Sequence, residues 1–179
     1  RYKDINADGE LDDEEDMCVI GNPFPKFTYG LNVSLDWAGF DMQLFFQGVY
    51  GNTIYNALRE RIEGNGLQSQ LSTAMRDVWT DKTPNGSLPN PNHTVNFYQS
   101  DRFLEDGSYL RLKNLQLGYT LPRSISEKLQ ISSLRLYVSA QNLLTFTNYS
   151  GYDPEVGGGV DYGNYPQSRT DMVGVNLSF

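Results

Sequence analysis

The chain has 179 residues, of which 39% are hydrophobic and 13% aromatic, and its formal net charge is −8. An acidic chain of this kind argues against nucleic-acid binding, because phosphate recognition needs a basic surface. No apolar run approaches the roughly 18 residues that a membrane-spanning helix needs, so a helical membrane protein is not expected. Strands that alternate apolar and polar residues are still compatible with a membrane β-barrel.

Two residue types offer little chemistry. Cys18 is the single cysteine, so it forms no internal disulfide and no thiolate metal site. His93 is the single histidine, and we expect it to be a surface residue rather than a catalytic base. The chain begins with Arg1 and has no initiator Met, so we expect a piece of a longer protein in which missing targeting signals mean little.

The first motif is an acidic loop, Asp4 to Glu15, that fits the calcium-binding pattern D-x-[DN]-x-[DN]-G-x5-E. That spacing directs hard oxygen atoms at one cation, and Gly9 allows the sharp turn between them. Calcium is the expected metal, with magnesium as the alternative, and a solvated acidic turn is the interpretation without metal. The candidate ligands are Asp4, Asn6, Asp8, Glu10 through its carbonyl, Asp12 through water, and Glu15.

Residues 1–25 are therefore expected to form an acidic metal-loop-like segment, and residues 26–50 a β-hairpin. The first strand alternates, with Trp37–Gly39 as the turn before the second strand. Strands of this length with aromatic ends are typical of transmembrane barrels, and a soluble antiparallel sheet is the alternative. The large apolar residues of one face are Phe27, Tyr29, Leu31, Val33, Leu35, Trp37, Phe40, Met42, Leu44 and Phe46.

A long loop follows, residues 53–107, in which apolar residues at helical spacing predict a helix over 68–80. Residues 109–147 are predicted to form two strands, with a change of apolar parity near Lys113 and Asn114 that predicts a β-bulge. Between these strands, 123–131 is a short connection with a helical turn.

Residues 148–168 are a second long loop, and 169–179 form the last strand. Because strands run up and down, the short connections fall at one end of the sheet and the long ones at the other. That arrangement predicts an all-β fold, an antiparallel up-and-down transmembrane barrel. Five strands cannot close a barrel, since the smallest have about eight.

Several motifs together resemble one family. They include Lys3–Gly9, Ile20–Gly30, Gly48–Asn52, Leu110–Tyr119, Gln141–Thr147, Ser150–Glu155, Tyr165–Arg169 and the terminal Phe179. This set resembles the C-terminal part of the SusC/RagA-like TonB-dependent outer-membrane transporters of Bacteroidetes. Residues 53–107 match least, as a variable extracellular loop would. Glu15 departs from the Asp often found at that position, which leaves the coordination number of the acidic loop open.

The resemblance implies a plugged barrel of about 22 strands, of which this chain supplies the last five. It implies a cell outer-membrane location with long loops outside, and energised uptake rather than covalent chemistry. The implied partners are a SusD-like surface lipoprotein, TonB acting through an absent N-terminal part, membrane lipid, and a large nutrient, first an oligosaccharide and otherwise a peptide.

Two other hypotheses stay open on the residues. One is a secreted, calcium-stapled β-sandwich that binds carbohydrate. The other is a glycosidase using Asp153 and Glu155, which we disfavour because no apolar pocket is predicted to raise one pKa. Tyr98, Tyr149 and Tyr162 are candidates for stacking on sugars, although packing is the expected role of each.

Overall fold

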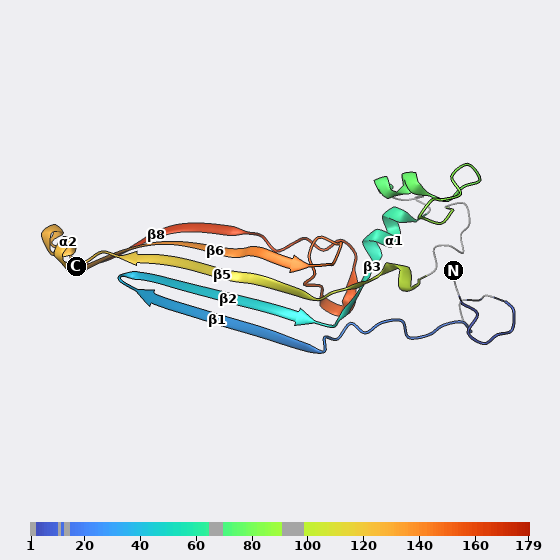
Figure 1. The fold of residues 1–179 in the computed structure, drawn as a ribbon, viewed down its shortest axis with the longest axis horizontal. Helices are drawn as coiled ribbons and strands as arrows, with labels where there is room; N and C mark the ends of the chain where they lie inside the picture. The colour runs from blue at the N-terminus through green and yellow to red at the C-terminus, as the bar shows by residue number, and fades with distance from the viewer. Residues whose placement is uncertain (1–2, 11, 13–14, 65–69, 91–98) are drawn as a thin grey trace. The chain divides into compact units, whose positions relative to one another are not determined.

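The computed structural model describes residues 3–10, 12, 15–64, 70–90 and 99–179. The chain divides into two compact units (Figure 1). The loop unit contains residues 1–24, 52–106 and 149–164, and the sheet unit contains 25–51, 107–148 and 165–179.

The sheet unit is a single antiparallel sheet with the strand order β1-β2-β5-β6-β8 (Figure 1). Each strand of this sheet pairs with the sheet strand that comes before or after it along the chain, which is the up-and-down order that the sequence predicts. The strands are β1 Phe27–Trp37, β2 Phe40–Tyr50, β5 Tyr109–Thr120, β6 Ser133–Thr147 and β8 Thr170–Ser178.

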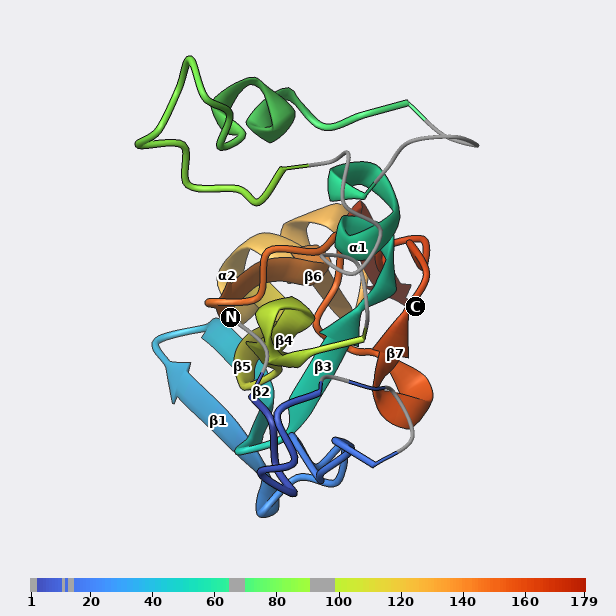
Figure 2. The same cartoon turned by 90° about the vertical axis from the view of Figure 1, so that its right-hand side faces the viewer.

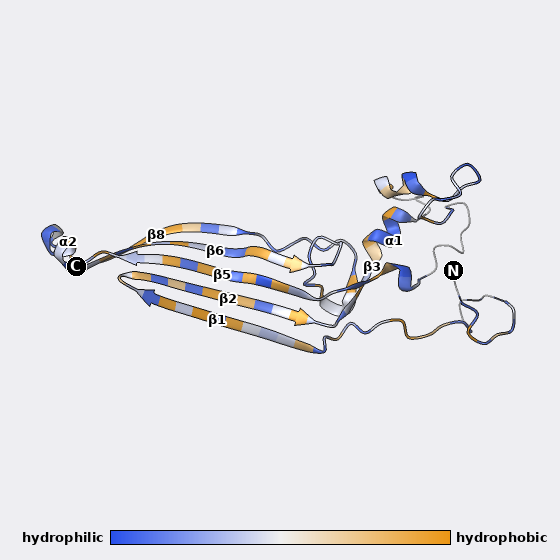
Figure 3. Ribbon diagram, viewed as in Figure 1, coloured by the Kyte–Doolittle hydropathy of each residue, from blue (hydrophilic) through white to orange (hydrophobic). Residues whose placement is uncertain are grey.

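One face of this sheet is apolar and exposed. Apolar and polar colours alternate along the strands, as expected when successive side chains point to opposite faces (Figure 3). Register aligns the apolar positions across the sheet, so that Leu35 is opposite Met42, Met42 is opposite Leu117, and Leu117 is opposite Val138. Exposed members of this face include Leu31, Leu35, Phe40, Leu117, Leu136, Val138, Leu144, Phe146, Val173 and Val175. Such a surface suits hydrocarbon as its solvent.

The short connections lie at one end of the sheet. The β1–β2 turn consists of Ala38 (φ 50°) and Gly39 (φ 86°), and two positive φ angles match the twist of a tight hairpin. The β5–β6 connection carries α2, Arg123–Ser126, and a short 3₁₀ turn, Glu127–Leu129. The long connections leave from the opposite end, beyond Tyr50 and Thr147.

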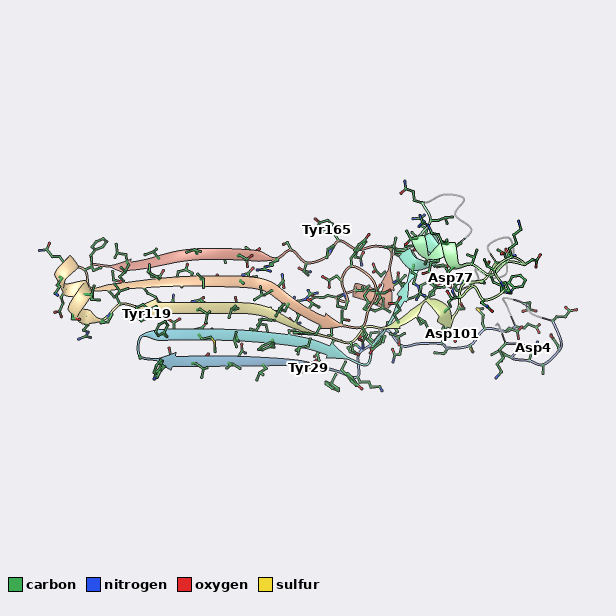
Figure 4. All side chains as sticks on the ribbon, turned by 45° about the horizontal axis from the view of Figure 1, so that its top comes forward. Asp4, Tyr29, Asp77, Asp101, Tyr119 and Tyr165 are labelled. Carbon is green, nitrogen blue, oxygen red and sulfur yellow. The ribbon has the colours of Figure 1, made fainter. Side chains whose placement is uncertain are left out.

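Aromatic pairs mark both ends of the strands. At the long-loop end the rings of Phe27 and Tyr50 are stacked with centroids 5.2 Å apart. At the hairpin end the rings of Phe40 and Tyr119 are 4.5 Å apart. Tyr29 and Tyr119 accordingly lie toward opposite ends of the sheet in Figure 4. Aromatic residues in two bands are typical of strands that cross a membrane.

A bulge lies at one level in two neighbouring strands, β5 and β6, and it confirms the change of parity predicted near Lys113. Leu44, Leu115 and Ala140 form one row of paired residues, and Phe46, Leu112 and Leu144 form the next apolar row. Between these rows the chain advances by two positions in β2, three in β5 and four in β6. The extra residues keep the apolar side chains on the same face above and below the bulge.

The loop unit contains a small sheet with the order β4-β3-β7 (Figure 2). Its strands are β3 Thr53–Asn56, β4 Leu104–Asp106 and β7 Val160–Asp161. β3 pairs antiparallel with β4 and parallel with β7, so two connections far apart in sequence share one sheet. Ile54 and Phe103 are fully buried in its core.

In the described part of the loop unit, α1 spans Ala57–Glu63, and short 3₁₀ turns cover Thr73–Asp77, Asp101–Phe103 and Gly157–Gly159. None of the described helices is long and apolar enough to cross a membrane.

The helix predicted over 68–80 is wrong in position and length. Among the described residues 70–80, only Thr73–Asp77 is helical, as a 3₁₀ turn, because the next backbone groups bond across to a second segment. Trp79 N donates to Leu88 O at 2.7 Å, and Asp77 accepts from Ser87 Oγ at 2.5 Å. Residues 68 and 69, His93, Tyr98 and the apolar Leu11 of the acidic loop lie outside the described residues.

Candidate functional site

The acidic loop folds around its own side chains. Asp4 accepts hydrogen bonds from the backbone amides of Ala7 (2.5 Å) and Gly9 (2.9 Å), whose positive φ angles of 63° and 90° bend the chain. Asp8 accepts from the Glu10 amide at 2.8 Å, and Asp12 accepts from the Glu15 amide at 2.6 Å. The spacing of Asp and Asn residues thus produces a series of Asx turns.

Three of the predicted ligand positions converge. Asn6 Nδ2 donates to Asp8 Oδ2 at 2.8 Å and to Glu15 Oε2 at 2.9 Å. The carboxylates of Asp8 and Glu15, at positions 5 and 12 of the calcium pattern, therefore both approach the side-chain amide nitrogen of Asn6. Hydrogen bonds from the Glu10 amide and the Asn6 side chain lower the pKa of Asp8, which keeps that carboxylate charged.

The chemistry of this donor set fits a hard divalent cation. The side chains of Asp4 and Asp12 and the backbone carbonyl of Glu10 complete an oxygen-rich loop whose backbone already turns as the pattern requires. Within the described part of the chain, no three carboxylate, imidazole or thiol groups form a preassembled metal centre. Metal binding by the six predicted residues stays a prediction.

A second polar site, which the sequence did not predict, lies in the loop unit. We define the Glu105 cluster as Asn56, Arg59, Glu105 and Ser150. Glu105 Oε1 accepts from Asn56 Nδ2 (3.1 Å), Arg59 Nη1 (3.3 Å) and Ser150 Oγ (2.7 Å), while Oε2 accepts from the Ser150 amide (2.8 Å). One carboxylate thus joins three segments of the chain.

Asn56 has two roles in this cluster. Its Oδ1 accepts from the Arg59 amide at 2.8 Å and caps the N-terminus of α1. Its Nδ2 donates to Glu105 and, at 3.3 Å, to Ser150 Oγ. The sequence signal that was available here is the Asn just before Ala57–Glu63, which is typical of a helix start.

Buried ion pairs extend the cluster. Glu63 accepts from Arg59 Nε at 2.9 Å within α1 and from Arg102 Nη2 at 3.2 Å. The side chain of Glu63 is only 9% exposed, so these two guanidinium groups compensate a charge that would be costly alone. The pairing fixes α1 against the 3₁₀ turn that contains Arg102.

The second long loop is closed by a buried tyrosine. Tyr149 donates its hydroxyl to Asp161 Oδ2 at 2.7 Å, and Asp161 Oδ1 accepts from the amides of Gly163 and Asn164. Burial, followed by the bond to Asp161, raises the pKa of Tyr149. Tyr149 is 6% exposed, so it packs and does not stack on a ligand, whereas Tyr162 is 76% exposed.

The carboxylates suggested for a glycosidase lie in a local turn. Asp153 is buried and accepts a hydrogen bond from the Glu155 amide at 2.9 Å. This bond joins the Asp153 side chain to the Glu155 backbone, as in an Asx turn. It does not pair the two carboxyl groups across a substrate site.

Comparison with known proteins identifies the family of this chain. No protein-family model matches the chain. It is 41% identical over 190 residues to TonB-dependent receptor P3 of Formosa agariphila, covering 99% of this chain and 19% of that protein. It is 25% identical over 185 residues to TonB-dependent receptor SusC of Bacteroides thetaiotaomicron, covering 99% of this chain and 17% of that protein.

Solved structures agree. Two structures of the RagAB peptide importer, in the "open-open" and "closed-closed" states, match with TM-scores of 0.82 and 0.83. Both show 31% identity and cover 95% of this chain and 19% of the matched chain. The chain belongs to the TonB-dependent receptors. The predicted SusC/RagA-like identity is confirmed, and the all-β barrel-fragment fold with it.

This receptor segment spans about a fifth of the length of the curated relatives it matches. Its location is the cell outer membrane, and the exposed apolar face of its sheet is the lipid-facing wall of a barrel. These relatives are receptors and importers, not enzymes. The secreted β-sandwich hypothesis is wrong, because the five-stranded sheet matches a transporter barrel.

Proposed function

We propose that this segment forms part of the wall and rim of a transporter that takes up a large nutrient across the outer membrane. Uptake would be driven by TonB and shared with a SusD-like surface lipoprotein. The observation that carries the proposal is the sheet itself. It has one exposed apolar face, and both long connections between its strands leave from one end. Strands arranged in this way support a barrel whose elaborated rim receives the nutrient.

An oligosaccharide is our first expectation for the nutrient. A peptide is the alternative, since the similar RagAB is described as a peptide importer. The exposed tyrosines of the loop unit suit either ligand, because an aromatic ring packs on the apolar face of a sugar or on a peptide side chain.

The test uses the full-length receptor in its native cells. Outer membranes are run on a detergent gel with and without boiling, and a strain that lacks the receptor is grown on a polysaccharide hydrolysate or a casein hydrolysate. We expect a heat-dependent shift in mobility and loss of growth on one hydrolysate. A soluble protein, or normal growth of the deletion strain on both, would contradict the proposal.

Partnership is tested on the same strain. A tagged receptor purified in mild detergent should retain a SusD-like lipoprotein at near-equal amount. Recovery of the receptor without any lipoprotein would remove the partner from the proposal and leave the uptake test intact.

We also propose that the acidic loop binds calcium. Asp4, Asn6, Asp8, Asp12 and Glu15 would supply side-chain or water-mediated oxygens, and Glu10 a backbone carbonyl. The cation would order the loop by replacing the internal contacts that Asn6 Nδ2 now makes. Calorimetric titration of the full-length receptor with CaCl₂ should show one site fewer in an Asp4→Asn, Asp8→Asn variant. An unchanged number of sites would contradict the proposal.

A further inference from the structure

Both ends of the loop formed by residues 149–164 are fixed by polar contacts. At its start, Ser150 gives both its amide and its hydroxyl to Glu105, at 2.8 and 2.7 Å. Near its end, fully buried Asp161 accepts from Tyr149 Oη and from two backbone amides. The loop carries two exposed tyrosines: Tyr152, which is 67% exposed and lies between these points, and Tyr162, which is 76% exposed and directly follows Asp161.

Glu105 is the member of this arrangement that joins separate parts of the sequence. It lies on β4 opposite Ile54, and its side chain is only 11% exposed. Its four donor groups match the roughly four acceptor sites of a carboxylate. Donors come from β3, from α1 and from the loop, so loss of the carboxylate would remove two hydrogen bonds that Ser150 donates and one that Arg59 donates.

The chain is about equally similar to RagAB in two states of that importer. The chain matches the "open-open" and "closed-closed" structures with TM-scores of 0.82 and 0.83, over 95% of its residues in each. A loop that is already ordered loses little conformational entropy when a ligand binds, which favours affinity.

We propose that Glu105 is a positioning residue that holds loop 149–164 in one conformation, so that Tyr152 and Tyr162 stay presented to the nutrient. The inference rests on the proposed function, because it assigns this loop a place in nutrient recognition. Glu105 itself does not touch the nutrient. It acts through Ser150, and the effect of its loss is on affinity rather than on the rate of translocation.

The experiment compares Glu105→Gln, Ser150→Ala and a control, Asp101→Asn, in the full-length receptor. Asp101 is an exposed carboxylate near β4. Membranes are treated with chymotrypsin, and cuts after Tyr152 and Tyr162 are followed by mass spectrometry. We expect cleavage about tenfold faster in Glu105→Gln, about two- to fivefold faster in Ser150→Ala, and unchanged in the control.

Uptake separates positioning from general damage. For the hydrolysate that the wild-type receptor imports, Glu105→Gln should raise the half-saturating concentration roughly three- to tenfold, with a similar maximal rate per surface receptor. A lower maximal rate with an unchanged half-saturating concentration would overturn the positioning role. So would cleavage of Glu105→Gln at the control rate.

The experiment distinguishes failure of the positioning role from failure of the proposed function. If Glu105→Gln does not reach the outer membrane, Ser150→Ala decides, because it keeps the carboxylate and removes one of its bonds. Cleavage of Ser150→Ala at the control rate would then overturn the inference. If the wild-type receptor imports neither hydrolysate, the proposed function fails whatever the cleavage rates; if it imports one, only the positioning role is at stake.

Discussion

Asp41 and Arg135 form an ion pair across the strand that separates them. Arg135 Nε lies 2.8 Å from Asp41 Oδ1, although Asp41 is on β2, Arg135 is on β6, and β5 runs between them. The pair passes over Gly118 of β5, where any Cβ would collide with both side chains. A glycine at this point lets two polar side chains lie flat along the face opposite the apolar one.

This pair should couple energetically. We expect Asp41→Asn and Arg135→Gln each to lower the free energy of unfolding, and the double variant to lose less than their sum by about 1–2 kcal/mol. The side chains are 20% and 21% exposed, so each single variant leaves a partly desolvated partner. Urea titration of the full-length receptor, followed by the mobility of unboiled samples, measures the coupling. Strict additivity would show that the two groups do not interact in the membrane.

Gly48 offers a second test of close contact. The ring of Tyr29 lies directly over Gly48, and its hydroxyl donates to Tyr109 O at 3.2 Å. Gly48→Ala should displace the ring and cost about 1–3 kcal/mol of unfolding free energy in the same titration. Gly157→Ala is the matched control, since nothing lies within 4 Å of its Cβ. Equal stability of both variants would contradict the packing of Tyr29.

Acid should loosen the loop that Glu105 holds. Burial tends to raise the pKa of Glu105, but hydrogen bonds from Ser150, Asn56 and Arg59 outweigh it and keep the pKa below its usual 4.5. A depressed pKa stabilises the fold fully above the unfolded-state value, and this contribution is lost as the pH falls through the lower folded-state value. Amide exchange in 149–164, corrected for intrinsic rates, should therefore increase below about pH 4. The same increase in amide exchange in the Glu105→Gln variant would show that another titratable group is responsible.

Asn142 tests the bulge. It has a φ of 52°, and its Nδ2 donates to Ser168 O at 3.0 Å. We expect Asn142→Val to cost about 1–2 kcal/mol in the urea titration, because a β-branched residue is strained in the left-handed region. Asn142→Gly relieves that strain and loses only the side-chain bond. If valine were as stable as glycine here, the left-handed backbone would not be needed for the bulge.

The sheet could be predicted from the sequence because its signals are local. Alternation over Phe27–Trp37 and Phe40–Tyr50 marks both strands of the hairpin, and Ala38–Gly39 marks the turn. The change of parity beside Lys113 identified the bulge, since one extra residue reverses the faces of a strand. Each of these patterns depends on whether a side chain lies on the apolar or the polar face of the sheet.

The loop unit could not be predicted, because its contacts join residues far apart in sequence. Glu105 and Ser150 are 45 positions apart, and Asn56 and Ser150 are 94 apart. β3 has four residues and β7 has two, too few for a period to appear. The helix expected over 68–80 failed because cross-segment bonds at Asp77 and Trp79 competed with helical ones.

The stepped bulge shows where a strand of this receptor can change in length. For the same step along the sheet, β2 uses two residues, β5 three and β6 four, and the apolar face is kept in each. A residue gained or lost at this level is therefore taken up by the bulge, whereas a single residue added elsewhere in a regular strand would reverse its faces and turn apolar side chains away from lipid. Relatives should therefore carry single-residue differences in strand length at this level, and other length differences in the connections.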